Sequence, residues 1–240
     1  MKVFNWNNVR LVLMFCLVIF LFSFTSKRNS KRKLTKTEVV FVGDNALFLK
    51  SEAVNKLLIE NKSNPSTIRK DRLDLNKLEQ VLNAQEMIEK ADVYVSIDGV
   101  LKAVVKQKTP IARVFNDEGS FYIDSEGNKM PLSSNFTARV PLVSGEINKK
   151  NNKDLFKLFK IIYDDAFLRK NIIGIQIMPN GSLLMLNRNY NYQIDFGGLI
   201  NIERKFQNYK AFFQKVSLDS TLNKYKKIDL RFTEQVVCTK

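Results

Sequence analysis

An uninterrupted apolar segment near the N-terminus constrains this chain most. Residues 11–22 are twelve in a row without a polar side chain. Residues 9–26 would make about 27 Å of α-helix at about 1.5 Å per residue, close to the hydrocarbon thickness of a bilayer. A cleaved signal peptide is the alternative interpretation, but residues 23–27 offer no small-residue cleavage site. We therefore expect a short tail over residues 1–8, a membrane helix over residues 9–26, and a large body on one side of the membrane.

Positive charge is concentrated next to this segment. The first 36 residues carry eight Lys and Arg and no acid, which leaves 31 bases against 24 acids in the rest of the chain. Six of the eight bases lie within residues 27–36. Such a basic linker suits contact with anionic lipid headgroups. Nucleic-acid binding is the competing interpretation, but no nucleic-acid motif accompanies the run, so we expect no nucleic-acid partner.

The residue types available for chemistry are few. The sequence has no His, which removes His-based proton transfer, His-dependent nucleophiles and the common zinc sites. Cys16 lies in the apolar segment and Cys238 near the C-terminus, so a structural disulfide within the chain is implausible. The adjacent acids Asp164 and Asp165 would point about 100° apart on a helix, which favours a solvated face over a catalytic dyad. We expect a binding protein without catalytic residues, a cofactor or a metal site.

The region after the basic linker has the pattern of a compact α+β module. The expected elements are, in order, a strand at residues 38–42, helices from Ser51 to about Asn61 and from Asp74 onward, and a hairpin of residues 93–97 and 100–105. The pair Asp98-Gly99 marks the hairpin turn, because such pairs tolerate the positive φ that tight hairpins require. Asp74 is placed to cap the second helix.

A second region of mixed strands and helices follows. Its expected elements are strands at residues 111–115, 121–124, 172–178 and 182–188, helices from about Lys153 and Glu203, and a final strand at residues 227–237. In that final strand Ile228, Leu230 and Phe232 alternate with Asp229 and Arg231, the period of a half-buried strand. The fold class is therefore α+β, with helices packed on an antiparallel-rich sheet.

Five motifs occur in order along the chain. They are the strand and glycine turn of residues 40–45, the hairpin and exit strand of residues 99–112, and the segments 122–127, 140–145 and 225–232. Together they resemble the FtsQ/DivIB family of bacterial cell-division proteins, which cross the membrane once and carry a POTRA domain followed by a β-domain. The resemblance covers almost the whole chain and assigns residues 37–109 to the POTRA domain and residues 110–240 to the β-domain. Residues 106–108 depart from it, because Lys-Gln-Lys stands where the family usually has Glu-Arg.

The resemblance implies a non-enzymatic divisome scaffold in the inner membrane. Its short N-terminus would lie in the cytoplasm and both domains in the periplasm, so that it links division proteins of the two compartments during septum formation. The implied partners are the small coiled-coil division proteins FtsB and FtsL, together with other divisome components. The family's last strand pairs with a strand of FtsB, and this partner-binding role transfers to Arg231, Phe232, Thr233, Glu234, Gln235 and Val236. The alternative is an ordinary final strand whose edge is blunted by charge.

Two other interpretations remain open at the level of sequence. One is a POTRA-type chaperone or secretion component that docks extended peptides. The other is a membrane-anchored basic protein or enzyme that faces the cytoplasm. Charge favours the latter, because two bases precede the apolar segment and six follow it, and the positive-inside rule then places the body in the cytoplasm. The family resemblance predicts the opposite orientation.

Overall fold

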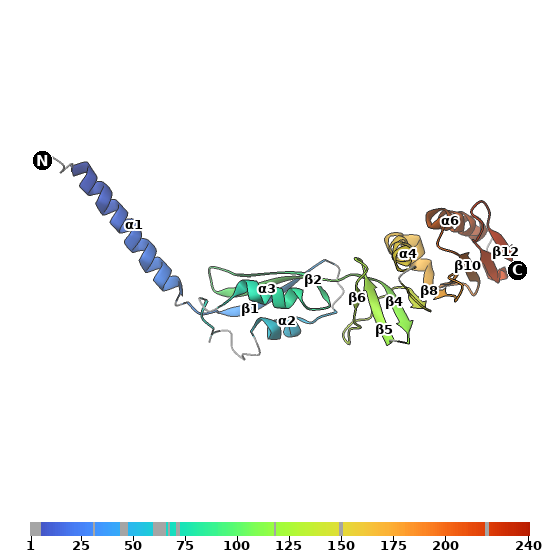
Figure 1. Cartoon of the computed structure of the whole chain (residues 1–240), viewed down its shortest axis with the longest axis horizontal. Helices are drawn as coiled ribbons and strands as arrows, with labels where there is room; N and C mark the ends of the chain where they lie inside the picture. The colour runs from blue at the N-terminus through green and yellow to red at the C-terminus, as the bar shows by residue number, and fades with distance from the viewer. Residues whose placement is uncertain are drawn as a thin grey trace. The chain divides into compact units, whose positions relative to one another are not determined.

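The computed structural model describes residues 6–30, 32–43, 48–59, 66, 68–70, 73–117, 119–148, 151–218 and 221–240. The chain forms two compact units, Met1–Asn45 with Leu49–Gln107, and Ala46–Phe48 with Lys108–Lys240. Figure 1 labels many of their helices and strands. The glycine-turn residues 44–45 and the expected last turn of a helix at residues 60–61 lie outside the described residues.

The apolar segment forms helix α1, Trp6–Ser30, within which Asn8–Arg28 has a mean hydropathy of 2.3. Among the described residues it is the one helix long and apolar enough to cross a membrane. Its apolar side chains are exposed, as the 73% exposure of Met14 illustrates. The helix outlasts the expected end at Ser26. Lys27 and Arg28 in its last turn favour this extension, because cations interact favourably with the C-terminal end of a helix dipole.

The first unit has a three-stranded sheet in the order β1-β3-β2. Its strands are β1 (Lys36–Val42), β2 (Ile88–Val95) and β3 (Val100–Gln107), with β1 parallel and β2 antiparallel to β3. Gly99 has φ +86° in the predicted hairpin turn. Ile97 was expected in the first strand of the hairpin but lies in the turn and is 83% exposed. The turn already begins at Ser96, whose hydroxyl accepts the Val100 N–H.

Helices α2 (Ser51–Leu58) and α3 (Leu75–Asn83) complete the predicted order of strand, helix, helix, strand, strand. The Asp74 carboxylate accepts the Lys77 backbone N–H at 3.0 Å, which confirms the predicted cap. Both helices bury apolar side chains in a core with alternate residues of the sheet. That core consists of Leu34, Val54, Leu58, Leu78, Leu82, Ile88, Ala91, Val93, Leu101, Ala103 and Val105.

The second unit is built on a nine-stranded sheet in the order β12-β11-β10-β9-β8-β7-β4-β5-β6. The strands are β4 (Pro110–Asn116), β5 (Gly119–Asp124), β6 (Lys129–Met130), β7 (Leu142–Ser144), β8 (Ile172–Ile177), β9 (Leu183–Asn187), β10 (Gln193–Gly197), β11 (Lys227–Asp229) and β12 (Val237–Thr239). The β4–β7, β7–β8 and β10–β11 pairs are parallel and the others antiparallel. The α+β fold class is therefore confirmed.

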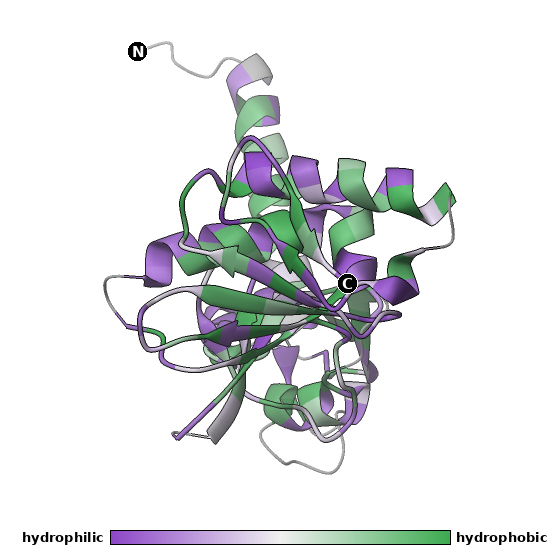
Figure 2. Cartoon of the chain, turned by 90° about the vertical axis from the view of Figure 1, so that its right-hand side faces the viewer, coloured by the Kyte–Doolittle hydropathy of each residue, from purple (hydrophilic) through white to green (hydrophobic). Residues whose placement is uncertain are grey.

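Helices α4 (Asn152–Asp164), α5 (Ala166–Asn171) and α6 (Ile202–Leu218) bury their apolar sides in one core with this sheet. Figure 1 shows α4 and α6 on the same side of it, and Figure 2 shows hydrophobic and hydrophilic residues alternating along helices and strands. Phe115, Leu142 and Leu186 stand exposed on the strands, at 59%, 49% and 49%. These three point to the sheet face opposite the helices, since the neighbouring Val114, Val143 and Met185 are buried.

The final strand predicted at residues 227–237 was wrong in its extent. The chain instead forms β11, a connection over residues 230–236, and β12 antiparallel to β11. Side-chain hydrogen bonds interrupt the strand. The Asp229 carboxylate accepts the Arg231 backbone N–H at 3.0 Å, and the Asn208 amide of helix α6 donates to the Thr233 carbonyl at 2.7 Å. Side-chain bonds of this kind compete with a sheet ladder.

Candidate functional site: the β12 edge

One edge of the nine-stranded sheet ends in an unpaired strand. Strand β12 pairs with β11 through the register Lys227–Thr239, Ile228–Cys238 and Asp229–Val237, and no strand in the described part of the chain lies beyond it. Its outer side therefore presents backbone N–H and C=O groups that an incoming strand could satisfy. The opposite edge, β6, has two residues and is followed by Pro131, which has no N–H to donate.

The predicted partner-binding residues lie beside this edge, not in it. Residues 231–236 make up most of the connection between β11 and β12, and we call these six residues the edge loop. The edge strand itself consists of Val237, Cys238 and Thr239, which the sequence reasoning left out of the site. The β-branched composition of this last segment was the available signal.

Arg231 is bound within the protein. Its guanidinium donates to Asp229 from Nε at 3.0 Å and from Nη2 at 2.6 Å, and Nε lies 3.5 Å from Asp195 Oδ2. Lys227 Nζ lies 2.9 Å from the same Asp195 oxygen. The hydrogen bond from Arg231 lowers the pKa of Asp229 below its ordinary value despite burial. Exchanging Arg231 for Glu would thus remove these interactions and disturb the edge loop, although the side chain is 54% exposed.

Gly197, at the end of β10, makes room for the Arg231 side chain. It has φ +68°, and a Cβ built there would lie 2.7 Å from Cγ of Arg231. Only glycine combines this backbone conformation with so close an approach. The position of the guanidinium thus depends on residues that are far apart in the sequence.

A buried lysine binds the backbone at the end of β10. Lys205 of α6 is 1% exposed, and its Nζ donates to the carbonyls of Phe196 at 2.9 Å and Gly198 at 2.8 Å. Burial lowers the pKa of this amine, and the nearby carboxylates of Asp195 and Asp229 oppose the shift. The interaction holds the end of β10 against helix α6. No pattern in the sequence predicts this interaction.

Helix α6 also holds the edge loop. Arg204 Nη2 lies 2.7 Å from Glu234 Oε2, and Asn208 binds the Thr233 carbonyl. Val236 packs against the core of the unit. The apolar side chains left available beside the edge are Phe232, which is 48% exposed, and Val237, which is 44% exposed.

Hydrogen-bonded tyrosines lie in the core close to Cys238. The hydroxyls of Tyr192 and Tyr209 are 2.9 Å apart, and the Asn187 amide donates to Tyr209 at 2.9 Å. Burial raises the pKa of both phenols and of the half-buried Cys238 thiol. Because these groups stay neutral at ordinary pH, they support the edge strand by packing and hydrogen bonding.

The other chemical candidates have structural roles. Asp164 pairs with Lys160 at 3.4 Å, whereas Asp165 caps α5 through the Leu168 N–H and pairs with Lys210. Although burial acts to raise the pKa of Asp165, its hydrogen bonds, led by that from Lys210, lower it. Among the described residues, no group of three or more His, Cys, Asp or Glu could hold a metal ion.

An apolar N-terminal helix, a three-stranded α+β module and a nine-stranded domain with an open edge together define a membrane-anchored, two-module class of protein. Residues 35–106 match the model of a POTRA-like domain, and residues 109–239 match the model FtsQ/DivIB, C-terminal related. The chain belongs to this FtsQ/DivIB-related family, which confirms the resemblance found in the sequence. Family and helix together indicate a single-pass membrane protein and support a role in cell division.

No curated protein matches the chain. Among solved structures, the chain is similar to the major extracytoplasmic domain of the trans isomer of the cell-division protein DivIB from Geobacillus stearothermophilus, with 13% identity and a TM-score of 0.35. That match covers 47% of this chain and 96% of the other.

Proposed function

We propose that this protein is a non-enzymatic divisome scaffold that binds a partner of the FtsB and FtsL type by strand addition at β12. The open edge of the nine-stranded sheet is the observation that carries this proposal. In strand addition, the backbone edge provides hydrogen bonds while neighbouring side chains select the partner. The protein would thereby connect division proteins on the two sides of the inner membrane during septum formation.

The edge loop gives the predicted partner-binding residues distinct tasks. Phe232 and Gln235 are exposed and border the edge, so they are placed to contact a docked strand. Arg231 and Glu234 instead fix the loop through Asp229 and Arg204. We therefore expect substitutions at Phe232 to change partner binding directly and substitutions at Arg231 to act through the shape of the loop.

Deletion of residues 237–240 tests the proposal, because it removes β12 and leaves β11 as the edge. The full-length and shortened chains, both purified in a neutral detergent, would be compared for capture of an FtsB–FtsL complex. We expect the deletion to abolish capture while the first unit stays folded. Capture that equals that of the full-length chain would reject β12 as the docking edge.

We further propose that both units face the periplasm, with the short N-terminus in the cytoplasm. Family membership supports this orientation, and the positive-inside rule opposes it less strongly for a long translocated body, since long domains cross largely regardless of charge. A topology reporter fused after Lys240 distinguishes the two. A reporter active only in the cytoplasm would reject the periplasmic scaffold and favour the cytoplasm-facing alternative.

A second candidate, docking of extended peptides by a POTRA-type module, has one observation in its favour. Among the described strands of the first unit, β1 is an edge strand that pairs with β3 alone, and Val40 and Val42 on it are 39% and 44% exposed. A Val42→Lys exchange in the full chain should abolish capture of an extended hydrophobic peptide if β1 is the binding edge. The FtsB–FtsL capture described above would then be unaffected.

A further inference from the structure

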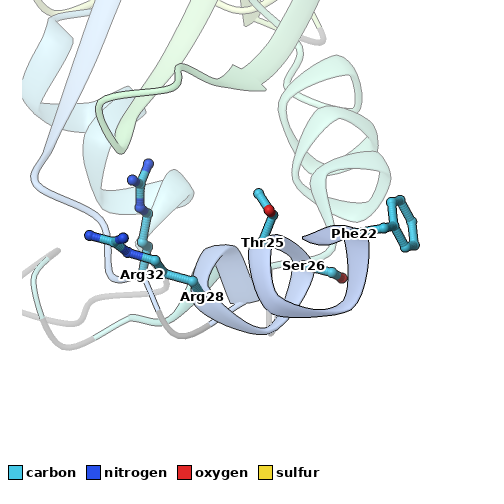
Figure 3. A pocket seen from close by; sticks show the side chains of 5 residues that line it. All are labelled: Phe22, Thr25, Ser26, Arg28 and Arg32. Carbon is cyan, nitrogen blue, oxygen red and sulfur yellow. The ribbon is translucent and has the colours of Figure 1, made fainter. Parts of the chain in front are cut away.

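A small cavity lies where helix α1 ends. It has a volume of about 360 Å³ and is lined by Phe22, Thr25, Ser26, Arg28 and Arg32 (Figure 3). Phe22 lies at the apolar end of the cavity and is 75% exposed. The lining therefore changes from aromatic through hydroxyl to guanidinium groups over a short stretch of chain, at the place where the candidate membrane span ends.

The two arginines place positive charge on one side of the cavity. Figure 3 shows both guanidinium groups extending to the same side, away from Phe22. No ion pair of Arg28 or Arg32 with an acid occurs among the described residues, and Arg32 makes one long hydrogen bond, 3.5 Å from Nη1 to the Ile97 carbonyl. The first acidic residue after α1 is Glu38, whose Oε2 lies 3.5 Å from Nζ of Lys36. Neighbouring like charges repel, and a bound anion would relieve that repulsion.

The chemistry of the cavity favours a phosphate group. Guanidinium forks bind phosphate oxygens bidentately, and two forks together can neutralise one phosphodiester. At the end of a membrane helix, a phosphodiester of this kind is the headgroup of a glycerophospholipid. We propose that Arg28 and Arg32 bind the phosphate of an anionic glycerophospholipid, whose acyl chain runs along the side of Phe22. This assignment rests on the proposed membrane anchoring and is independent of partner binding at β12.

The expected strength follows from the number of charges. The net contribution of about one hydrogen bond to the phosphate from each arginine predicts that removing one arginine weakens lipid binding about fivefold and removing both about thirtyfold. A specific site predicts a second effect. Arg28→Lys with Arg32→Lys keeps the charge but loses the planar forks, so it should weaken binding by an intermediate factor.

The experiment uses the full chain, stripped of lipid in a neutral detergent and titrated with phosphatidylglycerol, with bound lipid counted by native mass spectrometry. The matched control is Lys31→Gln with Lys33→Gln, which removes two charges from the same linker. Phosphatidylcholine and inorganic phosphate form the other arms. We expect R28Q with R32Q to lose about thirtyfold, and K31Q with K33Q about threefold or less, and we expect phosphatidylcholine and inorganic phosphate to bind far more weakly than phosphatidylglycerol.

Three results would overturn the proposal. Equal losses in the two double variants would show a diffuse basic surface in place of a site. Inorganic phosphate that binds as tightly as phosphatidylglycerol would show a site for free phosphate. No loss in R28Q with R32Q would remove the arginines from lipid binding altogether. Capture of FtsB–FtsL by the same variants serves as the folding control, and its failure in the unmodified chain would concern the proposed scaffold function alone.

Discussion

Phe232→Ala should weaken partner binding if the edge loop borders a docked strand. Phe232 is 48% exposed, and a phenylalanine side chain offers roughly 200 Å² for burial, so about 100 Å² remains for a partner to cover. At about 25 cal/mol per Å², full coverage contributes about 2.5 kcal/mol, or about 70-fold in Kd, and half coverage about eightfold. We therefore expect the Kd for an FtsB–FtsL complex to rise between about eightfold and about 70-fold.

Phe115→Ala is the matched control for this substitution. Phe115 lies in the same domain at 59% exposure, on β4, and five strands separate β4 from β12 in the sheet. Each substitution removes a phenylalanine side chain that is about half buried, so the two should lower the free energy of unfolding by similar amounts. Binding would be measured with the full chain in a neutral detergent. An equal rise in Kd for the two variants, or an unchanged Kd for Phe232→Ala, would refute the placement of the interface.

Three further predictions concern the supports of the fold. Asp74→Ala should lower the free energy of unfolding by about 1 kcal/mol through loss of the α3 cap, whereas Asp74→Asn keeps an acceptor and should change little in urea unfolding. Gly197→Ala should destabilise by about 1 kcal/mol or more, because φ is +68° and Arg231 is too close. Gly198→Ala, with open space around it, should be nearly neutral in the same assay, and equal effects would contradict the reasoning. Arg231 lowers the pKa of Asp229 in the folded protein below the unfolded value of about 3.9. The stabilisation by this ion pair is therefore present above about pH 3.9 and is lost as the pH falls through the folded pKa. The urea midpoint of Asp229→Asn should then fall less than that of the parent between about pH 5 and about pH 2.

Sequence reasoning succeeded where the determining interactions are local. The cap at Asp74 and the turn at Gly99 each depend on residues within a few positions, and both elements formed as expected. The hydrophobic periods of α4 and α6 likewise identify these helices, since apolar spacing on a helix is a property of the segment itself.

It failed where distant segments decide the structure. Strand β7 has three residues and is defined by parallel pairing with β4 and β8, so no local pattern reveals it. The extended strand expected at residues 227–237 is divided because Asp229 binds Arg231 locally while Asp195, more than thirty residues earlier, receives the same guanidinium. An alternating pattern of apolar and charged residues cannot show that those charged side chains are paired within the protein. The predicted partner-binding residues 231–236 therefore lie in a connection between two short strands and not in one long strand.

The shortness of β12 limits what strand addition alone can achieve. Three residues span about 10 Å and offer only a few backbone hydrogen bonds, each with a net contribution of about 1 kcal/mol. A freely diffusing peptide would therefore bind such an edge weakly, even with Phe232 covered. A partner held at the same membrane meets the edge at a much higher effective concentration, and linkage of this kind can raise overall affinity by about 10² or more without any new contact. In the proposed scaffold, helix α1 would strengthen docking at β12 by confining both proteins to one surface. A soluble fragment of the partner should then bind the chain far less tightly than the membrane-held partner does.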